Sequence, residues 1–590
     1  MDEVRLRYIK DTIDQLPKGN ITYKTIHGKK YPYYQWQENG KQRGRRVKDE
    51  ELEELTELIK RRKVLQEKLK ESGMPPKILE EEHFYSLIKR GDELRQFVEP
   101  VKVYKKRECY SQLHDYIYGN STDRVFILYG LKRTGKTTLI RQLIGEMPDE
   151  MFEKSAFIQI NSSIDLAKIN LDLRQLAKQK YKYVFIDEVT LMDEFIEGAA
   201  LFSDVFASSG MKIVLSGTDS LGFVFTQNQE LYDRCFMLHT TFVPYREFEN
   251  VLGVKGIDEY IRYGGTMSLG GVHYNQSGMT FATKESTDEY IDSAIASNIQ
   301  HSLRNYQDGG HFRHLAELYE AKELTNAINR IVENINHQFT LEVLTKEFKS
   351  SDLSISAKNM LKNRQNPSDL LYRVDREMVT QCLKDMLEIK NKQEQTIRIK
   401  DVHRFEIKEY LELLDLVVDL DTVVMSDLSK QKHTAISQPG LRYAQAEALI
   451  KALMDDSLMR SLSLVERNAT REFILNEIRG RMMEEIVLLE TMMAKPKCEV
   501  FKLIFAVGEF DMVVFDPEAA CCTIYEIKHS TERVAEQCKH LVDPKKCEDT
   551  EFRYGPIMDK VVIYRGETVE ENGIHYANVE EYLKGLLPLG

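Results

Sequence analysis

Residues 125–144 read VFILYGLKRTGKTTLIRQLI, and this stretch decides the fold of the chain around it. It begins as a short apolar run. The loop from Gly130 to Thr137 then matches the spacing GxxxxGK[ST], and TLIRQLI after it has the apolar spacing of a helix. A strand, a glycine-containing loop and a helix in this order form the context in which the motif binds phosphate. The stretch therefore predicts a phosphate-binding loop at the end of a buried strand.

The residue types in this loop suit a nucleoside triphosphate. Gly130 and Gly135 allow the backbone N–H groups to point inward, where the amino terminus of the following helix adds positive potential. Lys136 can reach the β and γ phosphates, and Thr137 can bind Mg²⁺. We expect ATP and Mg²⁺ as cofactors. The residues expected to bind them are Gly130, Leu131, Lys132, Arg133, Thr134, Gly135, Lys136, Thr137, Thr138, Asp187 and Ser216.

Two adjacent acids follow another apolar run, YVFIDE, and indicate hydrolysis. We expect Asp187 to hold the Mg²⁺ shell together with Thr137, and Glu188 to polarise the attacking water. In KIVLSGTDS, Ser216 and Thr218 end the next run, where they either sense the γ-phosphate or cap the strand.

A further catalytic candidate is Arg234 in LYDR, just before a later apolar run. It could neutralise transition-state charge in its own subunit or in a neighbouring one, and a structural salt bridge is an equal alternative. The role in a neighbouring subunit predicts a homo-oligomer.

Short apolar runs alternate with helical stretches throughout this part of the chain, which predicts a parallel α/β sheet covered on both faces. The runs are VFILYG, SAFIQIN, YVFIDE, KIVLSGT and FMLHTTFV. With KRECYSQLHDYI before the phosphate loop and YGG at 263–265, the stretch from Tyr104 to Gly265 resembles the archaeal-type, AAA-like and STAND-like P-loop ATPases. Members commonly have Arg-Arg where this chain has Lys132-Arg133, and Gly at the position of Asp233. The resemblance implies an ATPase core.

Residues 471–566 read as helix, strand, strand, strand, helix, strand, with the second helix expected in ERVAEQCKHLV. Asp511 lies in the second strand, and the strand period places Glu526 and Lys528 of the third strand on one face. Two carboxylates beside a lysine can hold Mg²⁺ and activate water. Glu484 on the first helix could add a ligand through water, and Gln537 could position substrate.

Together with Gly480, these residues resemble the PD-(D/E)xK nuclease superfamily, with Phe510-Asp511 in place of Pro-Asp. The resemblance implies a restriction-endonuclease-like fold and a metal-dependent nuclease in which Glu484, Asp511, Glu526 and Lys528 are catalytic. It also implies Mg²⁺ or Mn²⁺ between Asp511 and Glu526. A degenerate domain that only binds nucleic acid is the alternative.

The amino-terminal stretch ITYKTIHGKKYPYYQWQENGKQRGRRVK alternates in the strand period around an Asn39-Gly40 turn, and DEELEELTELIKRRKVLQEKLKE after it predicts a helix. Lysines and arginines interleaved with tyrosines suit contacts with nucleic acid, although a small sheet with solvated charges is the simpler explanation. Between the two α/β regions the chain reads as helical, and FTLEVLTKEFKSSDLSISAKNMLKNR predicts either core helices or a winged helix.

We therefore expect a multidomain α/β protein with four parts. These are a basic hairpin-and-helix module (1–76), an ATPase core (77–268), a helical lid (269–430) and a nuclease-like domain with a helical lead-in (431–590). The function that this organisation favours is an ATP-controlled nuclease in prokaryotic defence. The alternative is a STAND-like regulatory switch with a non-catalytic nucleic-acid-binding domain.

Composition limits the partners of the chain. With 42% hydrophobic and 30% charged residues it is typical of a globular protein, and no segment is apolar enough to span a membrane. The formal net charge of −12 means that nucleic acid, DNA rather than RNA, must bind through local basic patches. The start of the chain lacks a secretory h-region, and the eight cysteines lack paired spacing, so we expect a reducing cytoplasmic location.

Overall fold

The structure is a computed structural model that describes residues 16–26, 29–38, 41–71, 84–192, 195–218, 231–267, 312–349, 399–457 and 459–586, with a few single positions between them. The chain divides into two compact units, Met1–Tyr85 and Ser86–Gly590. Of the helices in the described residues, none is both long and apolar enough to cross a bilayer.

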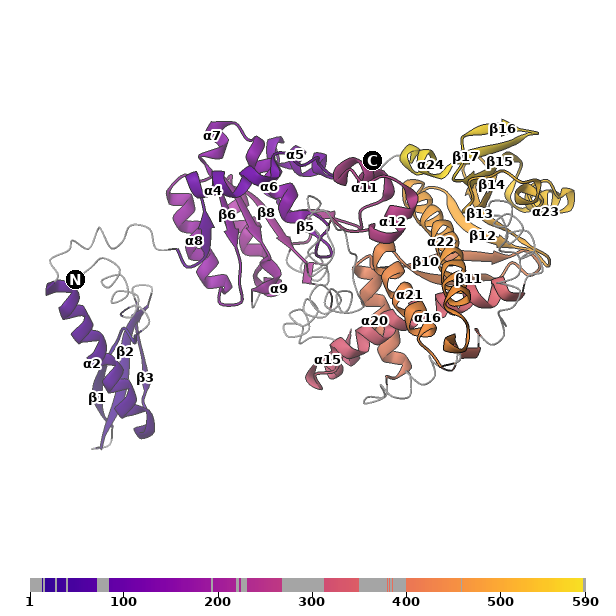
Figure 1. Cartoon of the computed structure of the whole chain (residues 1–590). Coiled ribbons are helices and arrows are strands. Elements are labelled where there is room, and N and C mark those ends of the chain that lie inside the picture. The colour runs from indigo at the N-terminus through magenta and orange to yellow at the C-terminus, as the bar shows by residue number, and fades with distance from the viewer. Residues whose placement is uncertain are drawn as a thin grey trace. The chain divides into compact units, whose positions relative to one another are not determined.

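The first unit contains a three-stranded antiparallel sheet and one long helix (Figure 1). Its elements are β1 (Asn20–Ile26), β2 (Lys29–Glu38), β3 (Lys41–Arg46) and α2 (Asp49–Glu71). The helix occupies the stretch predicted for it. The expected turn at Asn39-Gly40 lies outside the described residues, but the strands on either side pair in register from Glu38 with Lys41 to Tyr33 with Arg46.

The second unit begins with a six-stranded sheet in the order β4-β6-β7-β8-β5-β9. The five strands from β5 to β9 run parallel as predicted, and β4 adds an antiparallel edge beside β6. The strands are β4 (Leu87–Lys89), β5 (Val125–Tyr129), β6 (Ser155–Gln159), β7 (Tyr183–Asp187), β8 (Lys212–Gly217) and β9 (Cys235–His239). β5 lies between β8 and the edge strand β9, so the loop that follows it emerges one strand in from the edge of the sheet.

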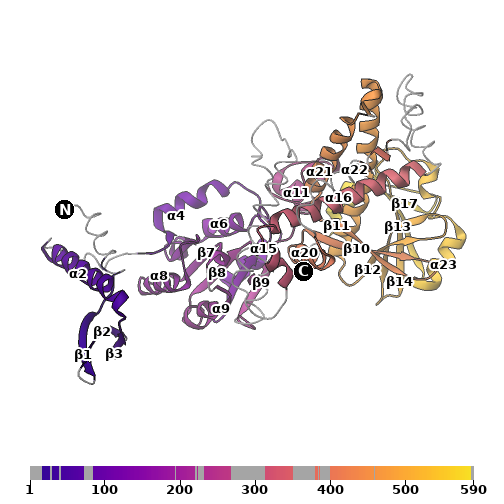
Figure 2. The same ribbon diagram turned by 90° about the horizontal axis from the view of Figure 1, so that it is seen from below.

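Helices α4, α5 and α6 share a core with one face of this sheet, because apolar residues of β5 to β8 pack against them. The helices of this region are α4 (Gly91–Val98), α5 (Tyr110–Tyr118), α6 (Lys136–Glu146), α7 (Asp149–Phe152), α8 (Leu166–Lys178) and α9 (Phe195–Gly198). Short 3-10 turns cover Glu99–Val101 and Val189–Leu191, and a π-helical turn covers Phe202–Ala207. Figure 2 shows the same sheet from below.

The middle of the chain is helical where it is described, with α11 (Tyr245–Leu252), α12 (Ile257–Tyr263), α15 (Arg313–Glu320), α16 (Leu324–Lys349) and α20 (Asp401–Leu413). The start of the suggested winged helix, Phe339, belongs to the continuous helix α16, and its second half lies outside the described residues. Helices α11 and α12 share a hydrophobic core with the carboxy-terminal elements, although the sequence grouped them with the ATPase core.

The carboxy-terminal sheet has eight strands in the order β11-β10-β12-β13-β14-β15-β17-β16. They are β10 (Val417–Val424), β11 (Lys430–Ile436), β12 (Glu499–Ile504), β13 (Glu509–Asp516), β14 (Cys521–Ile527), β15 (Ile557–Tyr564), β16 (Val569–Glu571) and β17 (Ile574–Asn578). The helices are α21 (Pro439–Met454), α22 (Leu464–Ala494), α23 (Pro544–Tyr554) and α24 (Val579–Gly585), with 3-10 turns at Met459–Ser461 and Ala535–Cys538.

Two elements of this region differ from the sequence expectation. β10 and β11 form an antiparallel hairpin in this sheet, and β10 pairs in parallel with β12, so a boundary at residues 430 and 431 falls inside one sheet. The helix expected in ERVAEQCKHLV is only a 3-10 turn, and the helix that precedes β15 is α23. Pro544 at its first turn and the Asp543 side chain, which accepts hydrogen bonds from two backbone N–H groups, determine where α23 begins.

Candidate active sites

The phosphate loop follows β5 and has the backbone that its glycines permit. Gly130 has a φ of 139° and Gly135 a φ of 95°, and Arg133 between them also adopts a positive φ of 67°. A Cβ atom at Gly130 would lie 2.4 Å from Thr240 O, so only glycine fits there. The next helix, α6, begins at Lys136. The predicted sequence of strand, loop and helix is therefore present.

Lys136 is buried and folds back over the loop. Its Nζ donates to Gly130 O and Leu131 O, each at 2.8 Å. Burial lowers the pKa of Lys136 to about 8, although the nearby carboxylates Glu188 and Asp187 oppose this effect. The third N–H of this ammonium is available for a phosphate, which would add an anionic partner to the two neutral carbonyls, so the loop fits a nucleoside triphosphate.

Thr137, Asp187 and Ser216 meet beside the loop, at the carboxyl ends of neighbouring strands. Thr137 Oγ1 donates to Asp187 Oδ2 at 2.8 Å, and Ser216 donates to the other oxygen of the same carboxylate. The Thr137 hydroxyl and the buried Asp187 carboxylate are the kinds of oxygen ligand that hold Mg²⁺ in P-loop proteins. The structure thus brings together three residues that lie far apart in the sequence.

Glu188 adopts a positive φ of 56°, which directs it away from the line of β7. Thr218 Oγ1 donates to Glu188 Oε2 at 3.2 Å. Burial, reinforced by the charge of Asp187, raises the pKa of Glu188 above its ordinary value.

Arg107 and Glu247, to which the sequence assigned no role, form a buried ion pair that supports the phosphate loop through a hydrogen bond to Thr134. Arg107 Nη1 donates to Thr134 O at 2.9 Å, and its Nε donates to Glu247 Oε2 at 2.6 Å. Both side chains are almost fully buried. Burial alone would lower the pKa of Arg107, but the Glu247 carboxylate raises it. The arginine was part of the KRECY stretch, yet its partner lies 140 residues away.

Arg234 lies at the opposite end of the sheet from the phosphate loop. Its backbone carbonyl accepts from Val125 N at the start of β5, whereas the loop begins after the end of that strand. Its side chain pairs with Asp204 at 3.1 Å and is about half exposed. The structure therefore does not bring Arg234 to the phosphate loop of its own chain, because a five-residue strand separates them by roughly 16 Å.

A second cluster forms on the carboxy-terminal sheet, where Asp511 of β13 faces Glu526 of β14. Lys528 Nζ lies 2.8 Å from Asp511 Oδ2 and 2.7 Å from Glu526 Oε2. Asp511 and Glu526 are 3% and 2% exposed, and the Lys528 side chain is 34% exposed. The structure thus brings together the three residues that the sequence selected, with the lysine on the open side.

The electrostatics of this cluster separate its two acids. Burial would raise the pKa of Asp511, but Lys528 and Lys502 hold it well below its ordinary value. Burial and the charge of Asp511 raise the pKa of Glu526. Glu526 Oε1 is buried and finds no hydrogen-bond donor among the described residues. Two facing carboxylates with a free oxygen are chemically suited to a divalent cation.

Lys502 of β12 is a buried cation that sequence reasoning missed. Its Nζ lies 2.5 Å from Glu509 Oε1 and 3.6 Å from Glu484 Oε2. Glu484 also pairs with Arg481, so it is neutralised beside the cluster and does not point freely into it. Gln537 donates to Ser530 Oγ at 2.6 Å and to Glu532 O at 2.9 Å, and so it braces the loop after β14.

Comparison with known proteins identifies two segments. A family model described as an AAA domain matches residues 122–249, and a model described as a domain of unknown function, DUF6788, matches residues 2–73. A comparison with curated proteins finds no match. Residues 122–249 thus form an AAA-type P-loop ATPase domain, which implies nucleotide binding and hydrolysis, typically with Mg²⁺.

Solved structures that are similar to the chain at low identity include the following three. The Saccharomyces cerevisiae Hsp104:casein complex is 12% identical with a TM-score of 0.22, over 45% of this chain and 50% of that chain. The Aeropyrum pernix ORC1 protein in complex with DNA is 11% identical with a TM-score of 0.24, over 64% and 99%. PCH-2 of C. elegans is 16% identical with a TM-score of 0.19, over 38% and 64%. The chain thus spans half the length of the Hsp104 chain.

Proposed function

We propose that the AAA-type domain uses ATP to control a metal-dependent nuclease in the carboxy-terminal domain. The observation that carries this proposal is the convergence of Asp511, Glu526 and Lys528 within hydrogen-bonding distance, with both carboxylates buried. Burying two facing carboxylates is costly unless cations neutralise them. Such an arrangement is therefore better explained by chemistry than by stability.

The order of elements supports the nuclease. Helix α22 precedes the antiparallel strands β12, β13 and β14, and β15 then pairs in parallel with β14 after α23. This order resembles the core of the PD-(D/E)xK superfamily. Gly480 of α22 has His529 Cβ within 3.6 Å of an added Cβ atom, so the helix passes close to the residue next to Lys528.

At the nucleotide site, each residue has a separate task. The loop N–H groups and Lys136 bind the phosphates, and Thr137 with Asp187 holds Mg²⁺, which neutralises phosphate charge when bound. Glu188 accepts the proton of the attacking water, and Thr218 fixes its orientation through the 3.2 Å hydrogen bond. Ser216 keeps Asp187 in place.

At the carboxylate site, Asp511 and Glu526 would hold a divalent metal, and Lys528 would position the water and stabilise charge on the phosphate. A divalent cation bound there lowers the pKa of water and counters phosphate charge. Lys528 lies between the two acids, where a bound divalent cation would take over its role of neutralising them and leave the ammonium to face the substrate. Its partly exposed side chain leaves room for this change.

The first experiment compares cleavage of labelled DNA and RNA by the parental protein and by Asp511→Ala, Glu526→Ala and Lys528→Ala variants, with Mg²⁺ or Mn²⁺. Loss of either acid should abolish cleavage, and loss of Lys528 should slow it by about 100-fold without removing the metal. ATP binding should not change. Glu518→Ala, an exposed acid on the same domain, is the matched control. Equal cleavage by parental and Asp511→Ala protein would refute the assignment.

One observation favours the alternative of a STAND-like switch whose carboxy-terminal domain only binds nucleic acid. Lys502 and Lys528 together already neutralise Asp511 without a metal. Under that alternative, parental protein binds DNA but does not cleave it with any metal. A Lys502→Met variant would then bind DNA with the same affinity, since Lys502 is buried.

For partners, we propose DNA in preference to RNA, and a role in prokaryotic defence in the cytoplasm. The amino-terminal sheet supports contact with nucleic acid, because Lys24 lies 4.7 Å from the ring centre of Tyr33 and Arg46 lies 4.0 Å from that of Tyr31. Paired strand positions place these four side chains on one face of the sheet. Alternating cations and aromatic rings suit a single strand or a phosphate backbone.

A further inference from the structure

Residues 264–267, which follow α12, are hydrogen-bonded to the phosphate loop at one end and to the start of α21 at the other. Met267 N–H donates to Arg133 O of that loop at 2.7 Å, and Gly440 N–H donates to Gly264 O at 3.2 Å. Gly265 has a φ of 96°, and a Cβ atom there would lie 2.7 Å from Gln438 Cα. The YGG stretch is thus a point of close backbone approach between the loop and the start of α21.

The other end of α12 contacts His529, the residue that follows Lys528. Asp258 Oδ1 lies 2.9 Å from His529 Nε2, and Arg565 Nη2 donates to Asp258 Oδ2 at 2.7 Å. His529 directly follows Lys528, and its side chain is 5% exposed. Burial would raise the pKa of Asp258, but His529 and Arg565 lower it to about 2. Asp258 is therefore a charged anchor for the turn that carries Lys528.

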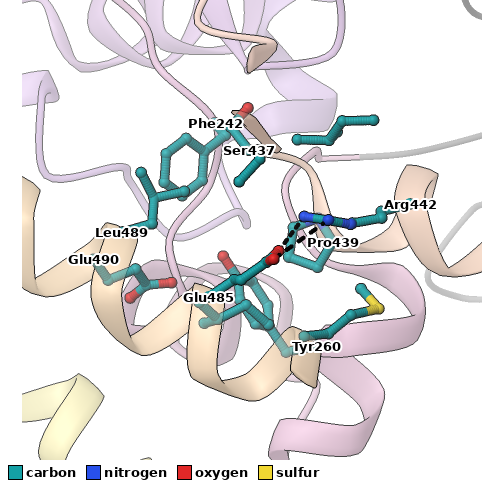
Figure 3. A pocket seen from close by; sticks show the side chains of 12 residues that line it. Phe242, Tyr260, Ser437, Pro439, Arg442, Glu485, Leu489 and Glu490 are labelled. Carbon is teal, nitrogen blue, oxygen red and sulfur yellow. Dashed lines mark hydrogen bonds and ion pairs between the residues drawn. The ribbon is translucent and has the colours of Figure 1, made fainter. Parts of the chain in front are cut away.

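Other hydrogen bonds join α11 and α12 to the carboxy-terminal domain. Tyr245 N donates to Glu490 Oε1 of α22 at 2.8 Å, and Ile257 N donates to Glu580 Oε1 at 3.1 Å. Figure 3 shows Glu490 beside a cavity that Phe242 and Tyr260 also line. Helix α12 packs against both α21 and α22. A displacement of α12 would therefore also load α21, α22 and His529, because packed interiors transmit strain.

The phosphate loop is hydrogen-bonded to the segment that follows α12. Lys136 bonds two carbonyls of the loop and keeps a third N–H for a phosphate, so phosphate binding changes the bonding of the loop. Arg133 O of the same loop accepts a hydrogen bond from Met267 N–H. Helix α12 has seven residues and is about 10 Å long, short enough to move as one body. We propose that Asp258 is a positioning residue that couples the state of the phosphate loop to the placement of Lys528. This inference rests on the proposed function and names how that function is regulated.

The test is hydrogen exchange of residues 528–534 in the full chain, with and without Mg²⁺ and a non-hydrolysable ATP analogue. The nucleotide should change exchange there by about fivefold or more in parental protein, the lower range of coupling between sites. In Asp258→Ala the change should fall below about twofold. The matched control is Glu259→Ala, which removes the next carboxylate of α12, one that pairs with Arg262 on the helix itself at 4.0 Å. It should respond like the parent.

Unchanged ATP affinity will show that the phosphate loop of Asp258→Ala is folded. The Asp258→Asn variant keeps the size of the side chain but loses its charge, and it should lose at least about half of the nucleotide-dependent change in exchange. If it is Asp258→Ala that fails to fold, Asp258→Asn alone decides. An absent response in parental protein, or an equal response in the Asp258 variants, would overturn the coupling. Hydrogen exchange does not depend on cleavage of nucleic acid. A parental protein whose exchange responds to nucleotide but which cleaves no nucleic acid would therefore refute the nuclease and leave the coupling intact. A nuclease whose ATP dependence survives Asp258→Ala refutes only the coupling.

Discussion

At the scale of single residues, Glu188 gives the most direct test of ATP hydrolysis. Glu188→Gln should still bind ATP, because Lys136 and the loop are intact. Its rate of hydrolysis should fall by at least about 100-fold, since the attacking water loses its base. Nucleotide binding and phosphate release, measured on the same preparation, check both statements.

The pH dependence of Glu188 has a defined sign. Burial and Asp187 raise its pKa, and only the ionised carboxylate accepts a proton, so hydrolysis should fall as the pH drops through this raised pKa. This acid limb should disappear in Glu188→Gln. Parental turnover by the glutamine variant would mean that another group activates the water.

At the scale of elements, the buried pair of Arg107 and Glu247 joins the phosphate loop to α11. Glu247→Gln leaves the guanidinium buried without a counter-charge, and we expect it to lower the local free energy of unfolding by about 3–5 kcal/mol and to weaken ATP binding. Hydrogen exchange of the amides of α6 is a suitable measurement, because the only tryptophan, Trp36, lies in the amino-terminal unit.

The neighbouring pair of Glu108 and Arg246 provides the matched control, since at 3.0 Å it joins the residue after Arg107 to α11 but is more exposed. In the part of the chain that the structure describes, this pair makes no hydrogen bond to the phosphate loop. Glu108→Gln should cost only about 0–1 kcal/mol. Similar losses in the two variants would show that Arg107 does not depend on Glu247.

At the scale of the whole molecule, the position of Arg234 decides between two roles. The far end of the sheet is too distant for action in the same chain, so a catalytic role requires a neighbouring subunit. Mixing Arg234→Ala with Lys136→Ala protein should then restore ATPase activity at about a quarter of the sites of a randomly mixed head-to-tail assembly.

In this mixture, one subunit supplies an intact phosphate loop and its neighbour an intact arginine. If the pair of Arg234 and Asp204 is structural, the mixture shows no more activity than its two components. Fully active monomers, measured by light scattering during turnover, would exclude the role in a neighbouring subunit.

The sequence by itself determined the features that a few consecutive residues encode. The phosphate loop, the adjacent acids after β7, the long helix α2 and most strands lie where local pattern predicts them, because backbone preferences and side-chain period act over short distances. The acids Asp511 and Glu526 could also be selected, since both lie on strands whose order was readable.

Only the tertiary structure decided which distant residues meet. Asp258 and His529 lie 271 positions apart, and β10 joins a strand about 80 positions later, so no local period records either contact. The same holds for Lys502, which reads as an ordinary strand lysine until β13 places Asp511 beside it. Periodicity states which face of an element is buried, whereas the partner on that face depends on chain topology and on the packing of the whole core.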